Sequence, residues 1–301
     1  MKNLVLGMLA MAAMVSCSSE NDVIDEVAGG IQDKVEIKIA AGVLNAETKA
    51  PIGDSDPVTV AILRKDGTAA WNTTPIEVSI TKQTDNLFAG TPQFYNTTGE
   101  NAIFFGYYPK GTISGTTTTF DTPDGKTDVL LTTELDAGTR SAPVQNASLT
   151  FAHQLSLIKF TFVKGDTYPD GDQVTSVKLK GAELPSGIDF ATKGITWTND
   201  KASSGIDAFT AGVYSIAIAP GTTISDGDAL MIQPGQKISL EIGTKNNGTF
   251  TVSDIKINGA DTNPEIGKQY NIALTFNKKS VSASASIEGW GEVIGGSGTV
   301  E

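Results

Sequence analysis

Few side chains in this sequence have the types needed for covalent or metal chemistry. Cys17 is the only cysteine and His153 the only histidine among the 301 residues. One histidine excludes a metal site that needs several, and its apolar surroundings favour a buried, hydrogen-bonded structural role over a catalytic one. We therefore predict no catalytic residue, no metal and no cofactor.

Paired aspartates are the remaining candidates for chemistry. Calcium loops need several oxygen ligands at set spacing and a closing bidentate acid, and no aspartate pair here fits that pattern. We interpret the pairs as turn residues that suit the local backbone. A carboxylate-based hydrolase stays an unfavoured alternative, because its acid pair is defined by a separation in space. The pairs are Asp54/Asp56, Asp121/Asp124, Asp170/Asp172 and Asp226/Asp228.

The N-terminus predicts export and a lipid on Cys17. Lys2 precedes the apolar run Leu4–Val15, whose length of about 12 residues is too short to span a bilayer. In this interpretation residues 1–16 are a lipoprotein signal peptide. Residues 17–33, which are rich in acidic side chains, form a tether between the lipid and the fold. The alternative is an ordinary signal peptide with an incidental cysteine.

The charge of the chain limits its partners. Lysine and arginine number 22 against 34 acidic residues, and the formal net charge is −12. Such a chain lacks the basic footprint that nucleic acids or anionic lipid surfaces require. We expect no nucleic acid partner, and contact with a membrane through the lipid anchor only. Without a second cysteine, stability must come from the buried core.

The elements that would carry these residues are short strands. Apolar residues alternate with polar ones in runs such as Val35–Ile39, and runs rich in Thr, Val and Ile are separated by turn signals. This pattern predicts an all-β fold of two antiparallel β-sandwich domains, residues 34–165 and 166–301. The first strand would span 34–44 and a polar, exposed loop 45–57.

The run Phe151–Val163 does not fit one regular strand. Phe151, Leu155 and Leu157 share one face of an extended chain, whereas Ile158 and the phenylalanines after it occupy the other. Because the side chains of a strand alternate strictly, we expect either a bulge near Leu157-Ile158 or a strand covered on both faces.

Several segments give the chain a family resemblance over nearly its whole length. They are the lipoprotein-like start, Phe104–Pro109, Phe151–Ile158, Val213–Gly221, Gly267–Tyr270 and Ile287–Trp290. With these the chain resembles the fimbrillin family (type V pilins) of Bacteroidetes. The resemblance implies two transthyretin-like β-sandwiches and a lipid-anchored precursor at the cell outer membrane, which becomes a subunit of a surface fimbria. Its partners would be other fimbrial subunits and a host or bacterial surface ligand.

The resemblance also implies a mechanism of assembly. A trypsin-like protease cuts a loop near the N-terminus, the first strand leaves, and a C-terminal strand of another subunit fills the groove. Here Lys49-Ala50 would be the bond cut, although lysine replaces the family's usual arginine; an uncleaved anchor subunit is the alternative. Val35, Ile37 and Ile39 would fill the groove before cleavage. The donor would lie in 280–301 and present Val281, Ala283, Ala285 and Ile287, unless this segment is a strand of its own domain.

A second function remains open at this stage. Exposed aromatic side chains bind sugars by stacking, so the chain could be a surface glycan-binding lipoprotein made of the same sandwiches. The candidate aromatic residues are Trp71, Tyr95, Trp197 and Trp290.

Overall fold

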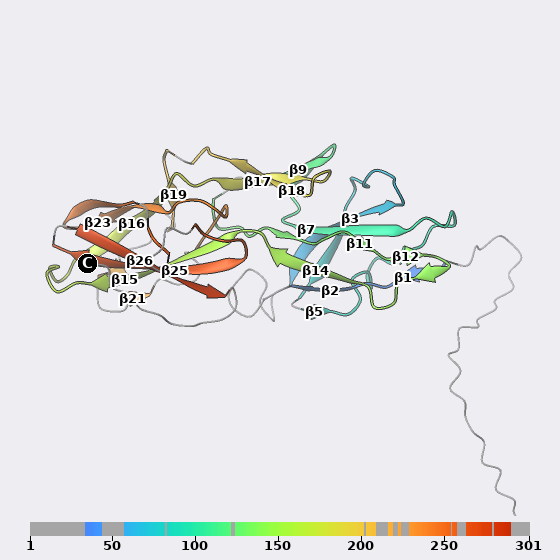
Figure 1. Ribbon diagram of the computed structural model, residues 1–301, viewed down its shortest axis with the longest axis horizontal. Coiled ribbons are helices and arrows are strands. Elements are labelled where there is room, and N and C mark those ends of the chain that lie inside the picture. Colours follow the sequence, from blue (N-terminus) through green and yellow to red (C-terminus); the bar gives the residue numbers. More distant parts are fainter. Residues whose placement is uncertain are drawn as a thin grey trace, which may run out of the picture. The chain divides into compact units, whose positions relative to one another are not determined.

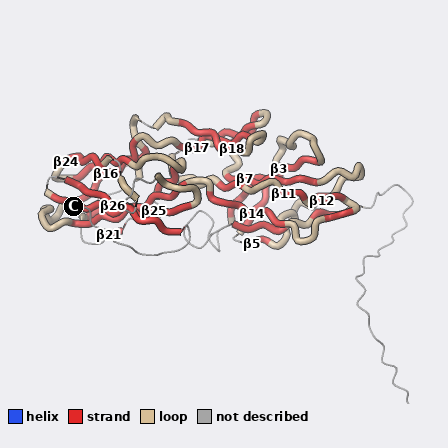
Figure 2. The backbone as a smooth tube through the Cα atoms, in the orientation of Figure 1, coloured by secondary structure: helices blue, strands red, loops and turns tan. Residues whose placement is uncertain are grey.

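A computed structural model of the chain consists of strands joined by turns and loops. It describes residues 34–43, 57–81, 83–121, 124–201, 203–208, 216–218, 222–223, 229–253, 255–257, 263–278 and 280–289. No helix occurs in these ranges, so none of them offers a helix that could span a membrane (Figure 2). The all-β prediction is confirmed.

The N-terminal half is centred on one large sheet (Figure 1). Its strands, in spatial order, are β4 (Ile76–Ile80), β3 (Val58–Asp66), β7 (Ala102–Tyr108), β10 (Leu130–Leu131), β14 (Ser148–His153), β2 (Ala40–Val43) and β5 (Gln83–Thr84), and β11 (Leu135–Asp136) also pairs with β7. Two small ladders flank it: β1 (Glu36–Ile37) with β6 (Gln93–Phe94), and β12 (Gly138–Thr139) with β13 (Ala142–Pro143).

Two sheets enclose the core of the C-terminal half. The first has the order β21 (Thr222–Thr223), β15 (Ser156–Lys164), β25 (Lys268–Asn277) and β26 (Ser280–Gly289), and β22 (Leu230–Ile232) also pairs with β15. The second has the order β19 (Ile206–Asp207), β16 (Gln173–Lys180), β23 (Ser239–Thr244) and β24 (Gly248–Val252), and β20 (Ile216–Ala217) also pairs with β16.

The sequence pattern predicted antiparallel sheets, but two pairs of neighbouring strands are parallel. β2 lies parallel to β14, and β15 lies parallel to β25. Parallel neighbours need a long connection, because the chain must return to the same end of the sheet before it continues. In both pairs the two strands are far apart in the sequence, which a pattern of local hairpins does not reveal.

The irregular run Phe151–Val163 is where the chain passes from one half to the other. β14 ends at His153, and β15 starts at Ser156 in a different sheet. Phe151 is buried in the N-terminal core and Phe160 in the C-terminal core, whereas Leu157 belongs to a third cluster. Both faces of β15 are thus covered near Leu157. The sheets change at residues 154–155, before the predicted boundary at 165/166, and Val35–Glu301 form one compact unit.

A small four-stranded sheet joins the two halves (Figure 1). From the N-terminal half it takes β8 (Thr112–Ser114) and β9 (Thr117–Thr119), and from the C-terminal half β17 (Leu184–Asp189) and β18 (Gly194–Thr198). β17 pairs antiparallel with β9, and Gly187 allows the close approach: a Cβ there would lie 2.0 Å from the carbonyl oxygen of Thr118.

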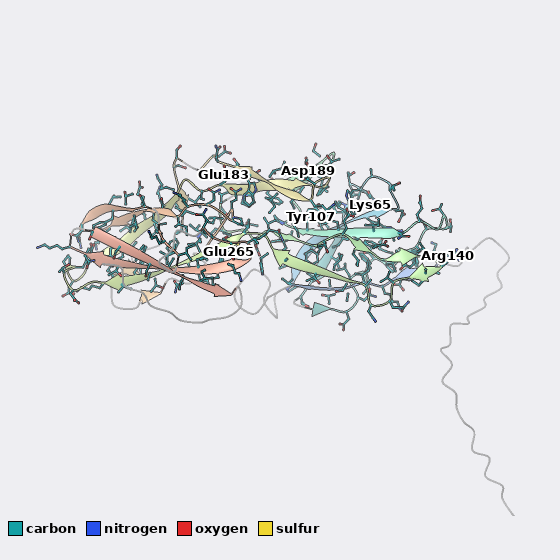
Figure 3. The ribbon with its side chains drawn as sticks, in the orientation of Figure 1. Lys65, Tyr107, Arg140, Glu183, Asp189 and Glu265 are labelled. Carbon is teal, nitrogen blue, oxygen red and sulfur yellow. The ribbon has the colours of Figure 1, made fainter. Side chains whose placement is uncertain are left out.

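The small sheet covers the outer face of the large one. Ala61, Leu63, Phe105 and Tyr107 of the large sheet form one buried cluster with Ile188 and Phe190. The Tyr107 and Phe190 rings lie 5.2 Å apart, and Figure 3 labels Tyr107 beneath the small sheet that carries Asp189. Glu134 adds an ion pair to Lys65 at 3.2 Å and one to Lys193 at 2.9 Å.

Two of the segments that carry the family resemblance meet inside the N-terminal half. The Phe151 ring packs on Gly106, where a Cβ would lie 2.5 Å from the ring. His153 is buried and its Nδ1 lies 2.5 Å from a carboxylate oxygen of Asp128, which also accepts a bond from the Val129 N–H. Burial raises the pKa of Asp128, although both hydrogen bonds favour its charged form. His153 therefore has the buried, hydrogen-bonded position that was predicted.

Asp172 lies at the centre of a hydrogen-bond network in the C-terminal half. Its carboxylate accepts bonds from the Tyr168 hydroxyl at 2.6 Å and from the Asn247 side-chain amide at 2.6 Å. The backbone N–H groups of Gln173 and Asn246 donate to its other oxygen. Burial alone would raise the pKa of Asp172, but these four bonds outweigh it and lower the pKa from 3.8 to about 2.

The Asp172 carboxylate should make the stability of the fold depend on pH in the acidic range. Because the folded pKa of Asp172 is depressed, its stabilisation is present above about pH 4 and is lost as the pH falls through 2. We expect the free energy of unfolding of the native chain, relative to Asp172→Asn, to fall by about 2 kcal/mol between pH 5 and pH 2. Denaturant titrations at each pH measure it. Asp170→Asn is the control, since that side chain is 98% exposed; parallel pH profiles for the native chain and Asp172→Asn would contradict the assignment.

Candidate functional site

The first described segment of the chain completes the N-terminal core. Ile37 and Ile39 are fully buried, Ala41 is 2% exposed and Val43 is 8% exposed, and Val35 packs against the same cluster. Lys38, between two of these side chains, is exposed. The segment therefore presents one apolar face to the core, as predicted.

The predicted single strand over 34–44 is two short strands. β1 pairs with β6, and after a break at Lys38-Ile39 the chain continues as β2 between β14 and β5. Ala41 and Val43 continue the apolar face that Val35, Ile37 and Ile39 begin, although they were not predicted to belong to it. The alternation is clear over Val35–Ile39, but it is concealed over Ala40–Gly42 because alanine and glycine have low strand propensity.

Non-covalent contacts hold this segment on both sides. The Tyr95 N–H donates to the Val35 carbonyl, and the Leu87 N–H to the Ile39 carbonyl at 2.7 Å. The Ala40 N–H donates to the carbonyl of Ala147 at 2.9 Å, next to β14. Without β2, β14 and β5 would each lose a neighbour and the core side chains beneath would face a groove. We call this place the β14–β5 groove.

Both ends of the predicted processing loop are anchored at the same end of the sheet. β2 runs parallel to β14 toward His153, and β3 begins at Val58 near the end of β7 at Tyr108. Tyr108 pairs with Leu130, which in turn pairs with His153. Lys49 and Ala50 lie outside the described residues, as does Cys17.

The predicted donor residues form a strand of their own half. β26 pairs with β25 from Ser280–Asn277 to Gly289–Lys268. Ala285 is 6% exposed, and Val281, Ala283 and Ile287 are partly buried against the C-terminal core. The alternative of a strand within the same domain thus describes these residues here, and 290–301 lie outside the described ranges.

The aromatic candidates for glycan binding that the structure describes are buried or partly buried. Tyr95 is buried and its hydroxyl donates to the Ala137 carbonyl at 2.6 Å. Trp71 packs near Phe105, with the Lys65 ammonium 4.4 Å from its ring centre. Trp197 is partly buried on the inner side of the small sheet, and Trp290 lies outside the described residues.

A cleft of about 200 Å³ is bordered by one of the aspartate pairs. Asp121 and Asp124 lie at its wall, and the Asp124 carboxylate accepts a bond from the Lys126 N–H, which is a turn contact. In the part of the chain that the structure describes, no three acidic, histidine or cysteine side chains are grouped to hold a metal ion. The other lining residues are Pro109, Gly111, Phe120, Gly125, Thr127, Val129 and Pro185.

The burial of the first segment can be tested with two neighbouring substitutions. Ile37→Asp places a carboxylate in the apolar core and should lower the free energy of unfolding by about 3 kcal/mol or more. Lys38→Asp, on the exposed side of the same segment, should change it by less than about 1 kcal/mol. Denaturant unfolding of the two purified variants gives both values. Equal stabilities would show that the segment does not fill the core.

Two solved structures with the same fold come from Bacteroides species. One protein assigned to cell adhesion, from Bacteroides uniformis, has a TM-score of 0.55 at 15% identity, over 85% of this chain and 98% of its own. Another, from Bacteroides ovatus, has a TM-score of 0.53 at 14% identity, over 88% of this chain and 100% of its own. At these identities the likeness shows the fold.

The family is shown by a match to a family model. The search of curated proteins, in contrast, finds no match to this sequence. The family model described as fimbrillin-like matches residues 45–290, which is most of the chain and both of its halves. This chain belongs to the fimbrillin-like family.

Proposed function

We propose that this chain is a structural subunit of a surface fimbria, assembled by exchange of its first strand and contributing to adhesion. The observation that carries the proposal is how the segment Val35–Val43 completes the N-terminal core. Its side chains pack into the core and its backbone pairs with β14, and both contacts are non-covalent. Family membership supports the same role, since fimbrillins are fimbrial proteins. No catalytic group is needed for this function.

The β14–β5 groove suits strand exchange for a physical reason. A strand inserted there gains backbone hydrogen bonds from two neighbours, and its alternate side chains enter the core. Removal of the native segment would uncover Leu149 and Phe151 on β14 and Phe88 beyond it, all of which are buried. The exposure of such a large apolar surface would strongly favour capture of a replacement strand.

Cleavage at Lys49-Ala50 would make the native segment replaceable. Everything before the cut, including the lipid on Cys17, would then be held only by the contacts of Val35–Val43. A contact between one subunit's groove and another subunit's strand is heterologous and does not close, so it propagates a filament. If the bond stays intact, the same chain remains lipid-anchored at the outer membrane and serves as an anchor subunit.

The glycan-binding alternative has less support. It needs an exposed aromatic surface, whereas Tyr95 is buried and the Trp71 ring is flanked by Phe105 and Lys65. The hydrolase alternative needs a pair of carboxylates facing one substrate, and Asp124 instead bonds to its own turn. The surface ligand of the assembled fimbria would be a glycan or protein of a host or of another bacterium.

Assembly can be tested on the chain without its signal peptide. Brief trypsin treatment should cut after Lys49 and produce a ladder of oligomers that resists detergent, because each inserted strand adds a continuous set of hydrogen bonds and buried side chains. Mass spectrometry locates the cut, and gel electrophoresis without boiling shows the ladder. The matched control is Lys49→Ala, which should stay monomeric. Cleavage after Lys49 without any ladder would contradict exchange assembly.

A further inference from the structure

The small sheet that joins the two halves ends in a strand with an open edge. Among the described strands, β17 pairs with β18 on one side and none pairs with it on the other. β18 has five residues, Gly194–Thr198, and carries neither a charge nor a proline. Isoleucine, threonine and tryptophan favour extended backbone. An edge of this kind presents backbone N–H and C=O groups that a further strand can pair.

Other edge strands of the described sheets are protected against such pairing. β4 carries Glu77, which forms an ion pair with Lys110 at 2.6 Å, and a charge on an edge discourages pairing. β24 is uncharged, but it lies against β26 of the opposite sheet. β8, at the other edge of the small sheet, has only three residues. In the part of the chain that the structure describes, β18 has none of these three protections.

The inner side chains of β18 are incompletely covered. Ile195 and Trp197 pack against the cluster that contains Phe105 and Tyr107, yet both are only partly buried. Thr196, between them, is exposed, and its hydroxyl oxygen accepts a bond from the Ser186 hydroxyl at 3.2 Å. The apolar inner face of the small sheet therefore reaches its edge. A further strand at that edge would cover more of both apolar side chains.

The sequence of β18 is complementary to itself. When two copies meet edge to edge about a two-fold axis perpendicular to the sheet, their strands pair antiparallel, and opposite residues face the same side. If Thr196 lies opposite Thr196 of the second copy, all five residues pair and Ile195 lies opposite Trp197 twice. Such pairs of an aromatic and a β-branched side chain stabilise a sheet. A shift by two residues in either direction would place Lys193 or Asn199 opposite one of these apolar side chains.

We propose that the edge of β18 is an interface between two copies of this chain, whose small sheets join into one continuous sheet through antiparallel β18 strands centred on Thr196. Beyond the strand ends, Lys193 of one copy then lies near Asp200 of the other, so opposite charges meet at both ends. The contact is isologous and closes on itself. It therefore joins subunits of two neighbouring filaments side by side and does not lengthen a filament, which sets it apart from strand exchange in the β14–β5 groove.

Cysteine cross-linking tests the register. The chain from Ser18 onward contains no native cysteine, and its 45–57 loop is left uncut. Thr196→Cys sets two thiols on directly opposite residues, with Cα atoms about 4.5 to 5.5 Å apart, which suits a disulfide. We expect most of this variant to run as a reducible dimer in gel electrophoresis after mild oxidation. Thr198→Cys is the matched control: its two copies would lie about 14 Å apart along the strands, so it should cross-link at least tenfold more slowly.

A charge at the two-fold axis tests the interface without a covalent bond. Thr196→Lys places two ammonium groups opposite each other, which should raise the dissociation constant of the dimer at least tenfold in sedimentation velocity. Thr251→Lys is the control, because Thr251 is also exposed but lies on β24. Neither variant should change the midpoint of thermal unfolding, since both side chains point to solvent.

The other outcomes overturn the proposal. If Thr196→Cys cross-links no faster than Thr198→Cys, the register is overturned. If the uncut native chain stays monomeric up to about 1 mM, or if Thr196→Lys dimerises as well as the native chain does, the interface is overturned. None of these results bears on strand exchange, because that mechanism requires the cut after Lys49.

Discussion

The closure of the N-terminal core by the chain's own first segment is the interaction on which this structure depends. Ile37, Ile39, Ala41 and Val43 fill the β14–β5 groove, and backbone bonds to Ala147, Leu87 and Tyr95 hold them there. The chain continues from this segment to β3 through residues 44–57. Its stabilising contribution is large because it is apolar and buried, yet it is entirely non-covalent. Under the proposed mechanism, cleavage of one peptide bond would therefore free the segment for replacement by another strand.

The contacts that join the two halves of the molecule do not involve this segment. The small sheet joins β9 to β17, its inner side chains pack on Phe105 and Tyr107, and Glu134 pairs with Lys65 and Lys193. These contacts tie the halves together on the face of the large sheet opposite the groove. The β16–β23 sheet and the Asp172 network likewise belong wholly to the C-terminal half. Loss of β2 would therefore leave the connection between the halves intact.

Much of the fold could be predicted from the sequence, because strands that bury one face alternate visibly. The apolar face of Val35–Ile39, for example, is buried as expected. The small sheet was missed, since β8 and β9 are mostly threonine and serine and β17 contains Pro185 and Gly187, which usually end strands. The parallel pairs β2–β14 and β15–β25 were also missed, because pairing between distant segments leaves no local pattern. The role of the groove was an expectation from the family resemblance, whereas the strands that border it, β14 and β5, are known only from the structure.

The most direct test of the account is hydrogen exchange along β14 during assembly. Amides of Ser148–His153 should be protected in the intact precursor, where β2 covers that edge, and should exchange faster once the first segment has been cut and removed. In the oligomer they should regain protection, because a strand from another subunit covers the same edge. Protection of β14 that stays unchanged when the first segment is removed would contradict the account.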